Sequence, residues 1–221
     1  MKLIDFSNDL DTELSWRKYE LYILKSSIPE SANKKQQAFL RMAIPILYAH
    51  FEGFIKVSAY YYLKYVTSRK LKYSELLEQF IIIGLKSKLN LKEANSIEKQ
   101  TKIIKLILEN FDNQLKLPTK NIINTKSNLN FKVFSEILFL IGLDKKIFKN
   151  YESVINDLIT HRNYIAHGEN KTVDKDTFEK FYSEIINLMS CFKTVLEDHA
   201  IQEKYKKRPN NIVYKQWRIK C

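Results

Sequence analysis

The sequence contains few of the residues that interrupt regular structure: four glycines and four prolines among 221 residues. A protein with many β-strands needs a turn after nearly every strand, and such turns are rich in glycine and proline. This composition therefore disfavours a many-stranded fold and favours long helices joined by few loops. Hydrophobic residues make up 45% of the chain, with 13 Tyr and 13 Phe, so a substantial core is expected.

Metal-binding and redox patterns are also scarce. The two cysteines, Cys191 and Cys221, are too few for a disulfide framework or a cysteine metal cluster, which favours a reducing compartment. The sequence has no His-x3-His or Cys-x2-Cys spacing and no glycine-rich phosphate loop. We therefore expect no metal ion and no other cofactor.

Long uninterrupted apolar runs are missing as well. Residues 1–9 lack the apolar segment of a signal peptide. The most apolar run, Met42 to Leu63, is interrupted by His50, Glu52 and Lys56, and charges near the middle of a membrane span are costly. We expect a buried helix here, no membrane association and a cytoplasmic protein.

Positive charge is abundant, with a formal net charge of +12 at pH 7. Such an excess favours a polyanionic partner, because lysines and arginines that neutralise phosphates release counterions. A basic surface without a nucleic-acid partner is the alternative that charge alone leaves open.

Apolar residues recur at helical spacing in several segments. We predict helices over residues 8–26, 33–67, 131–141, 147–167 and 176–205, two helices joined by a short loop over 74–115, and a loop over 118–130. The segment 33–67 is apolar on more than one face, as in the central helix of a bundle, and Pro45 predicts a kink or a break in it. The predicted fold class is all-α, an antiparallel helical bundle. Residues 1–207 form a single domain, with 70–130 as candidate inserted helices and loop, and 208–221 form a basic C-terminal tail.

The segment 147–167 carries the most informative pattern. Arg162 continues an apolar stripe, and an unpaired buried charge is costly, so its guanidinium should face a cleft, an interface or an ion pair. A polar line runs beside this stripe: Asn156, Thr160, Asn163 and His167. Gly168 predicts the end of the helix, so the His167 imidazole should project from a helix C-terminus.

An arginine and a histidine near one phosphodiester are sufficient for RNA cleavage. The histidine can take the proton of the 2′-hydroxyl or donate a proton to the leaving 5′-oxygen. The arginine can hold the non-bridging oxygens and stabilise their developing charge.

Residues 161–169 (HRNYIAHGE) resemble the R-x4-6-H signature of the HEPN superfamily. Residues 46–56 (ILYAHFEGFIK) look like the second-helix motif of the HEPN branch associated with restriction and toxin–antitoxin loci. The late helix ending in EKYK at 203–206 also resembles that branch. The resemblance covers residues 8–67 and 131–207 and leaves 70–130 unmatched.

The resemblance implies an all-α HEPN-type fold and a metal-independent endoribonuclease whose products end in a 2′,3′-cyclic phosphate. Arg162 and His167 match the catalytic pair, and Asn163 matches the polar residue that supports it. The resemblance further implies a homodimer with a composite RNA cleft and a role as a toxin or anti-phage defence effector, held by an antitoxin or defence-system partner protein.

Two further residue groups carry alternatives. Glu52 can simply pair with Lys56 at i, i+4, or it can support the catalytic pair together with His50. His50 alone is more often a buried core histidine. The tail contributes Lys206, Lys207, Arg208 and Trp217, which suit contacts with single-stranded RNA, or alternatively dock on the bundle.

Two other functions are consistent with the sequence: a non-catalytic helical module that binds RNA or a partner protein, and a DNA-binding accessory subunit of a restriction system. The intact Arg162 and His167 favour the enzyme.

Overall fold

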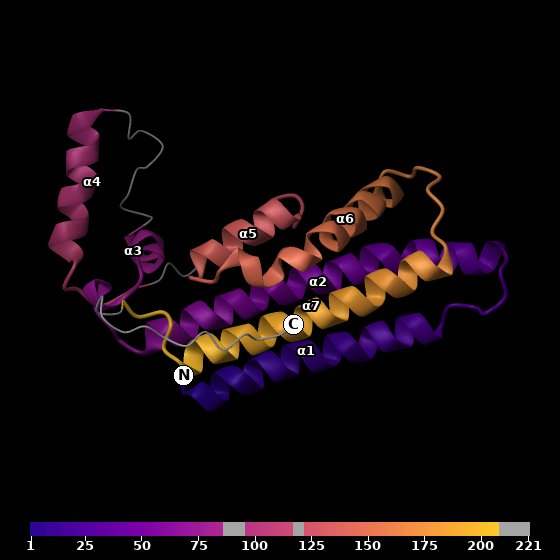
Figure 1. Cartoon of the computed structure of the whole chain (residues 1–221), viewed down its shortest axis with the longest axis horizontal. Coiled ribbons are helices and arrows are strands. Elements are labelled where there is room, and N and C mark those ends of the chain that lie inside the picture. Colours follow the sequence, from indigo (N-terminus) through magenta and orange to yellow (C-terminus); the bar gives the residue numbers. More distant parts are fainter. Residues whose placement is uncertain (86–95, 117–121, 208–221) are drawn as a thin grey trace.

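The computed structural model describes residues 1–85, 96–116 and 122–207. Within these residues the protein is all-α, with seven α-helices, two 3-10 helices and no β-strand (Figure 1). The elements in chain order are α1 (Leu3–Ser26), α2 (Lys34–Ser68), η1 (Tyr73–Glu75), α3 (Glu78–Leu85), α4 (Ile97–Asn110), α5 (Phe131–Leu140), η3 (Lys145–Tyr151), α6 (Glu152–Ala166) and α7 (Lys175–Ile201). The predicted fold class is therefore confirmed.

Helix α2 is the central helix of the bundle and packs against α1, α6 and α7 (Figure 1). Its buried residues lie on several faces, among them Leu47, Phe51 and Phe54. By length and composition alone α2 would be apolar enough to cross a membrane. Its contacts are those of the buried core helix predicted from the sequence.

Pro45 predicted a kink or a break; helix α2 continues through this residue, so the break does not occur. Proline has no backbone N–H, so the helix loses one hydrogen bond at a cost of about 3 kcal/mol. The neighbouring Ile44 and Leu47 are fully buried. Each such side chain contributes about 1.5–3 kcal/mol through burial, which outweighs the loss.

Contacts between the helix ends define the directions of the long helices. The Met1 carbonyl accepts hydrogen bonds from Ser68 and Arg69 at the end of α2, so α1 and α2 are antiparallel. Leu77, which follows α2, donates its backbone N–H to Tyr205, which follows α7, at 3.0 Å. Helices α2 and α7 therefore run in the same direction, and α6 runs opposite to both (Figure 1).

Aromatic rings join the second layer, α5 and α6, to the long helices. The fully buried Phe134 ring of α5 lies 6.3 Å from the Phe51 ring of α2, 5.4 Å from Phe148 of η3 and 5.9 Å from Phe192 of α7. One side chain of α5 thus contacts three other elements, and these contacts position α5 and η3, which precede the helix carrying the candidate site.

Most predicted helices agree with the structure to within a few residues. Helix α5 ends as expected, because Gly142 has a φ of 81° and Leu143 donates its N–H to the Leu138 carbonyl at 2.8 Å. The segment predicted as one helix over 147–167 consists of two elements, since η3 precedes α6.

A polar cluster lies between α1 and α2. His50 Nε2 is 3.3 Å from Glu20 Oε2, and the His50 ring is 5.3 Å from the Trp16 ring. The buried Arg17 pairs with Glu13 on the same helix. Burial is the main cause that lowers the pKa of His50 from its ordinary value of 6.5; Glu20 acts against it, and Arg17 lowers the pKa further.

We expect Phe134→Ala to lower the free energy of unfolding by about 3–5 kcal/mol, because it removes a ring that packs on four others and leaves a cavity. Urea unfolding followed by circular dichroism measures this change. Phe139→Ala, on the same helix but 64% exposed, is the matched control and should change stability by less than about 0.5 kcal/mol. Equal losses in both variants would contradict the predicted core position of Phe134.

The lowered pKa of His50 makes stability depend on pH. As pH falls below 6.5, the unfolded chain binds a proton at this histidine before the folded chain does. The stability contributed by neutral His50 is therefore present above pH 6.5 and is lost as pH falls through the lower folded pKa. We expect urea unfolding between pH 7.5 and about 5 to show a steeper loss for the wild type than for His50→Gln. Identical pH profiles would contradict the prediction.

Candidate active site

The C-terminal end of α6 is built by His167 and Gly168. Gly168 has a φ of 77°, a conformation that favours glycine, and its N–H donates to the Ile165 carbonyl at 3.1 Å. Glu169 donates its N–H to the Tyr164 carbonyl at 2.9 Å, which completes a Schellman motif. His167 is the C-cap residue and is exposed. The sequence prediction of a histidine at a helix C-terminus is confirmed.

Arg41 of α2 forms hydrogen bonds with the segment that follows His167. The Arg41 guanidinium donates to the Glu169 carbonyl at 2.9 Å and also to the Lys171 carbonyl. These bonds hold the connection between His167 and α7, and the Schellman motif holds the side toward α6. Arg41 was not among the predicted site residues, because its partners are backbone groups about 130 residues away in the sequence.

Arg162 is half-buried between α6, α2 and the loop before α5. Its Nη1 donates to Asn128 Oδ1 at 2.8 Å and to Asn163 Oδ1 at 2.9 Å. Its Cζ lies 4.8 Å from the centroid of the Tyr48 ring. No carboxylate pairs with this guanidinium among residues 1–85, 96–116 and 122–207. The positive charge is therefore oriented without being neutralised.

The Tyr48 ring packs against the Arg162 guanidinium. Its buried hydroxyl accepts the Leu129 backbone N–H at 2.7 Å. Burial of the phenol raises the pKa of Tyr48 to about 12; the Leu129 N–H lowers this pKa, and the hydrogen-bonded Glu52 carboxylate raises it. The phenol is thus neutral near pH 7, and we assign it a positioning role.

The loop before α5 supplies the residue that sequence reasoning missed. It was predicted only as a polar loop, yet Ile122, Ile123 and Leu129 are buried. This packing brings Asn128 to Arg162. The apolar residues within this asparagine-rich segment were the available signal that the loop packs on the bundle. The sequence alone does not show that Asn128 contacts a residue 34 positions later.

Several predicted residues meet at this site. Asn163 bonds Arg162 and lies one helical turn before His167, and Glu52 reaches Arg162 through Tyr48. Within the described residues Glu52 makes no ion pair with Lys56, so the simple i, i+4 pair is not formed.

Other predicted residues lie elsewhere. His50 faces Glu20 and Trp16 of α1, so the structure does not bring it to Arg162. Lys206 pairs with Glu203, and Lys207 lies 3.1 Å from Glu78, at the end of the bundle opposite to His167. The remaining tail residues, Arg208 and Trp217, lie outside the described residues.

The Arg162 and His167 side chains do not point in one direction. Five helical positions separate them, which corresponds to about 140° around the axis and a rise of about 7.5 Å. Asn163 and His167, at i and i+4, share one side of α6. A single chain therefore presents a cation near α2 and an exposed imidazole, and the amide of Asn163 contacts the cation.

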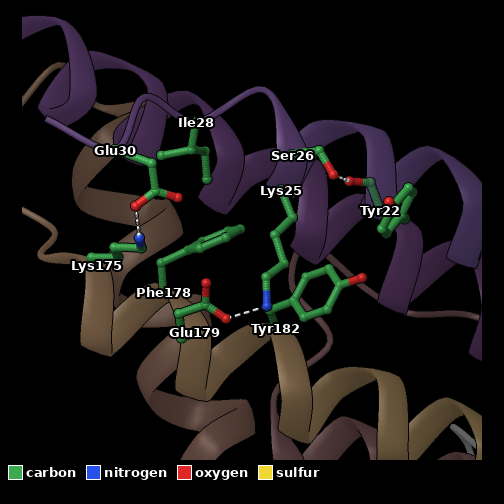
Figure 2. Close-up of a pocket in the computed structure, with 9 residues that line it drawn as sticks. All are labelled: Tyr22, Lys25, Ser26, Ile28, Glu30, Lys175, Phe178, Glu179 and Tyr182. Carbon is green, nitrogen blue, oxygen red and sulfur yellow. Dashed lines mark hydrogen bonds and ion pairs between the residues drawn. The ribbon is translucent and has the colours of Figure 1, made fainter.

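A separate pocket of about 260 Å³ lies between the end of α1 and the start of α7 (Figure 2). Its two lysines are already neutralised, because Lys25 pairs with Glu179 and Lys175 lies 2.6 Å from Glu30. None of the predicted catalytic residues lines it, so this pocket is not the candidate active site.

Comparison with protein families gives a match to the family described as RiboL-PSP-HEPN, over residues 12–198. No curated protein and no solved structure matches the chain. The family match includes the part of α1 from residue 12 onward, the whole of α2 and α6, and most of α7, and thus both Tyr48 and the segment from Arg162 to His167. This chain belongs to the RiboL-PSP-HEPN family, within the HEPN superfamily that its sequence motif resembles.

Proposed function

We propose that this protein is a metal-independent endoribonuclease that cleaves single-stranded or loop RNA. The observation that carries this proposal is the state of Arg162: two amide oxygens and an aromatic ring hold its guanidinium, and no carboxylate in the described part of the chain neutralises it. An oriented and uncompensated guanidinium is suited to bind and stabilise a phosphate. The family match supports a nuclease or an RNA-related module.

In the proposed reaction the ribose 2′-oxygen attacks the adjacent phosphorus, and the bond between phosphorus and the 5′-oxygen breaks. His167 takes the 2′-hydroxyl proton as a general base or, when protonated, donates a proton to the leaving 5′-oxygen. Arg162 stabilises the negative charge that develops on the non-bridging oxygens. The products carry a 2′,3′-cyclic phosphate and a 5′-hydroxyl, and DNA is not cleaved because it lacks the attacking hydroxyl.

We further propose that two copies assemble so that their α6 helices form one cleft. The divergence of Arg162 and His167 within one chain supports this assembly, because a second copy can supply the group that the first directs away from the substrate. It also allows one His167 to act as base and the other as acid. From the resemblance of the motif, we propose a role as a toxin or anti-phage effector that a partner protein restrains.

We expect the purified protein to cleave total RNA in the presence of EDTA and His167→Ala to lose at least about 100-fold in rate, the usual contribution of a general acid–base residue. Arg162→Lys keeps the charge but loses the planar fork, and we expect a similar loss. Gel electrophoresis with end-group analysis measures cleavage and detects the cyclic phosphate.

His161→Ala is the matched control, because this histidine lies on the same helix but packs on the Phe181 ring, with centroids 5.2 Å apart. It should retain most of the activity. Equal activity in the wild type and His167→Ala would contradict the assignment. RNA binding without cleavage by the wild type would favour the alternative, a non-catalytic HEPN module.

The composite cleft predicts a dimer. Light scattering coupled to size-exclusion chromatography should give twice the chain mass of 26.3 kDa at micromolar concentration. A monomer that cleaves RNA under the same conditions would overturn the composite cleft and leave the catalytic assignment of His167 in place.

A further inference from the structure

A broad groove of about 1120 Å³ lies between α5, η3 and the first turns of α6. None of the residues assigned to cleavage lines it. Its wall on α6 includes Asn156, the first residue of the polar line that ends at His167. The groove therefore adjoins the candidate active site along one helix.

Lysines contribute most of the charged side chains of this groove. Four lysines line it: Lys132, Lys145, Lys146 and Lys149.

The acidic residues of the groove are already engaged. Glu136 pairs with Lys126 at 2.6 Å, and Glu152 pairs with Lys149. Asp144 Oδ1 accepts the Lys146 backbone N–H at 2.9 Å as a helix cap. Within the described residues no carboxylate pairs with the ammonium groups of Lys132, Lys145 and Lys146, which leaves three cations available to an anionic ligand.

An exposed aromatic ring lies among these lysines. Phe139 of α5 lines the groove and is 64% exposed, whereas Phe131 and Phe134 on the same helix are buried. A single exposed aromatic residue is common on protein surfaces. In a groove with three free lysines, however, this ring adds a surface on which a base can stack. Stacking aromatic rings and neighbouring cations together bind single-stranded nucleic acid.

The polar line on α6 connects the groove to the cleavage site. Asn156, Thr160 and His167 lie along one side of the helix, and Asn156 and His167 are about 16 Å apart along the axis at about 1.5 Å per residue. Asn156 Oδ1 already accepts the Phe131 N–H at 3.1 Å, which fixes the amide between the groove and α6. A strand bound along this line passes from the lysines to the imidazole.

We propose that this groove binds the segment of single-stranded RNA that flanks the cleaved phosphodiester, with its phosphates on Lys132, Lys145 and Lys146 and a base stacked on Phe139. This inference rests on the proposed nuclease function and identifies its substrate as an RNA several nucleotides longer than the dinucleotide that is cut.

The test measures RNA binding without cleavage. In a His167→Ala background, fluorescence anisotropy with a labelled 12-nucleotide RNA compares Lys145→Gln/Lys146→Gln and Phe139→Ala with the parent. The double variant should flatten the slope of log affinity against log salt by roughly 1.4, at about 0.7 per lost phosphate contact. Phe139→Ala should weaken binding by about fivefold or more through lost stacking.

Lys102→Gln/Lys105→Gln is the matched control. It removes the same charge from exposed lysines of α4, where Lys102 and Lys105 pair with Glu98 and Glu109. This control should bind RNA like the parent. Groove variants that bind no worse than the control, with the same salt slope, would overturn the groove proposal.

Two further readouts separate this proposal from others. Groove variants that keep His167 should cleave a dinucleotide as fast as the wild type but cleave the 12-nucleotide RNA more slowly. If the wild type cleaves neither RNA, the nuclease function is refuted, and the binding measurements still test the groove. If the groove variants become monomeric by light scattering and keep their RNA affinity, the groove is a contact between copies and the proposal fails.

Discussion

Tyr48 connects the three parts of the molecule on which the candidate site depends. Its backbone belongs to the central helix, its hydroxyl accepts the Leu129 N–H, and its ring lies under the Arg162 guanidinium. The phenol is buried and neutral near pH 7, so these contacts do not change with pH in that range. The position of Arg162 therefore depends on the register of α2 in the core, and core packing and site geometry are not separable.

Arg17 and Arg162 differ in whether a carboxylate neutralises the guanidinium. Arg17 is buried between α1 and α2 and pairs with Glu13, as expected of a structural arginine. Arg162 has amides and a ring as its neighbours. Such contacts orient a guanidinium at about 1.5–3 kcal/mol per charged hydrogen bond, but they leave its charge available. A carboxylate in their place would compete with the phosphate of a substrate.

Features that depend on residues close together in the sequence could be predicted from the sequence. The helical spacing of apolar residues predicted the main helices, and Gly168 predicted the helix end at His167. Geometry also separates His50 from Glu52, since residues two apart in a helix lie about 200° apart and cannot face one site. Asn128 was beyond prediction, because its bond to Arg162 spans 34 residues and forms only when the loop packs. The unbroken helix at Pro45 likewise depends on tertiary burial.

Binding alone would require the cation of Arg162, whereas catalysis also requires a proton donor or acceptor in a fixed place. The His167 backbone is held by the Schellman motif on one side, and Arg41 ties the following residues to α2 on the other. The imidazole is nevertheless exposed to solvent. A rigid backbone under an exposed titratable side chain serves proton transfer better than docking. Because Arg162 and His167 diverge within one chain, their use on one phosphate makes assembly of two copies part of the proposed chemistry.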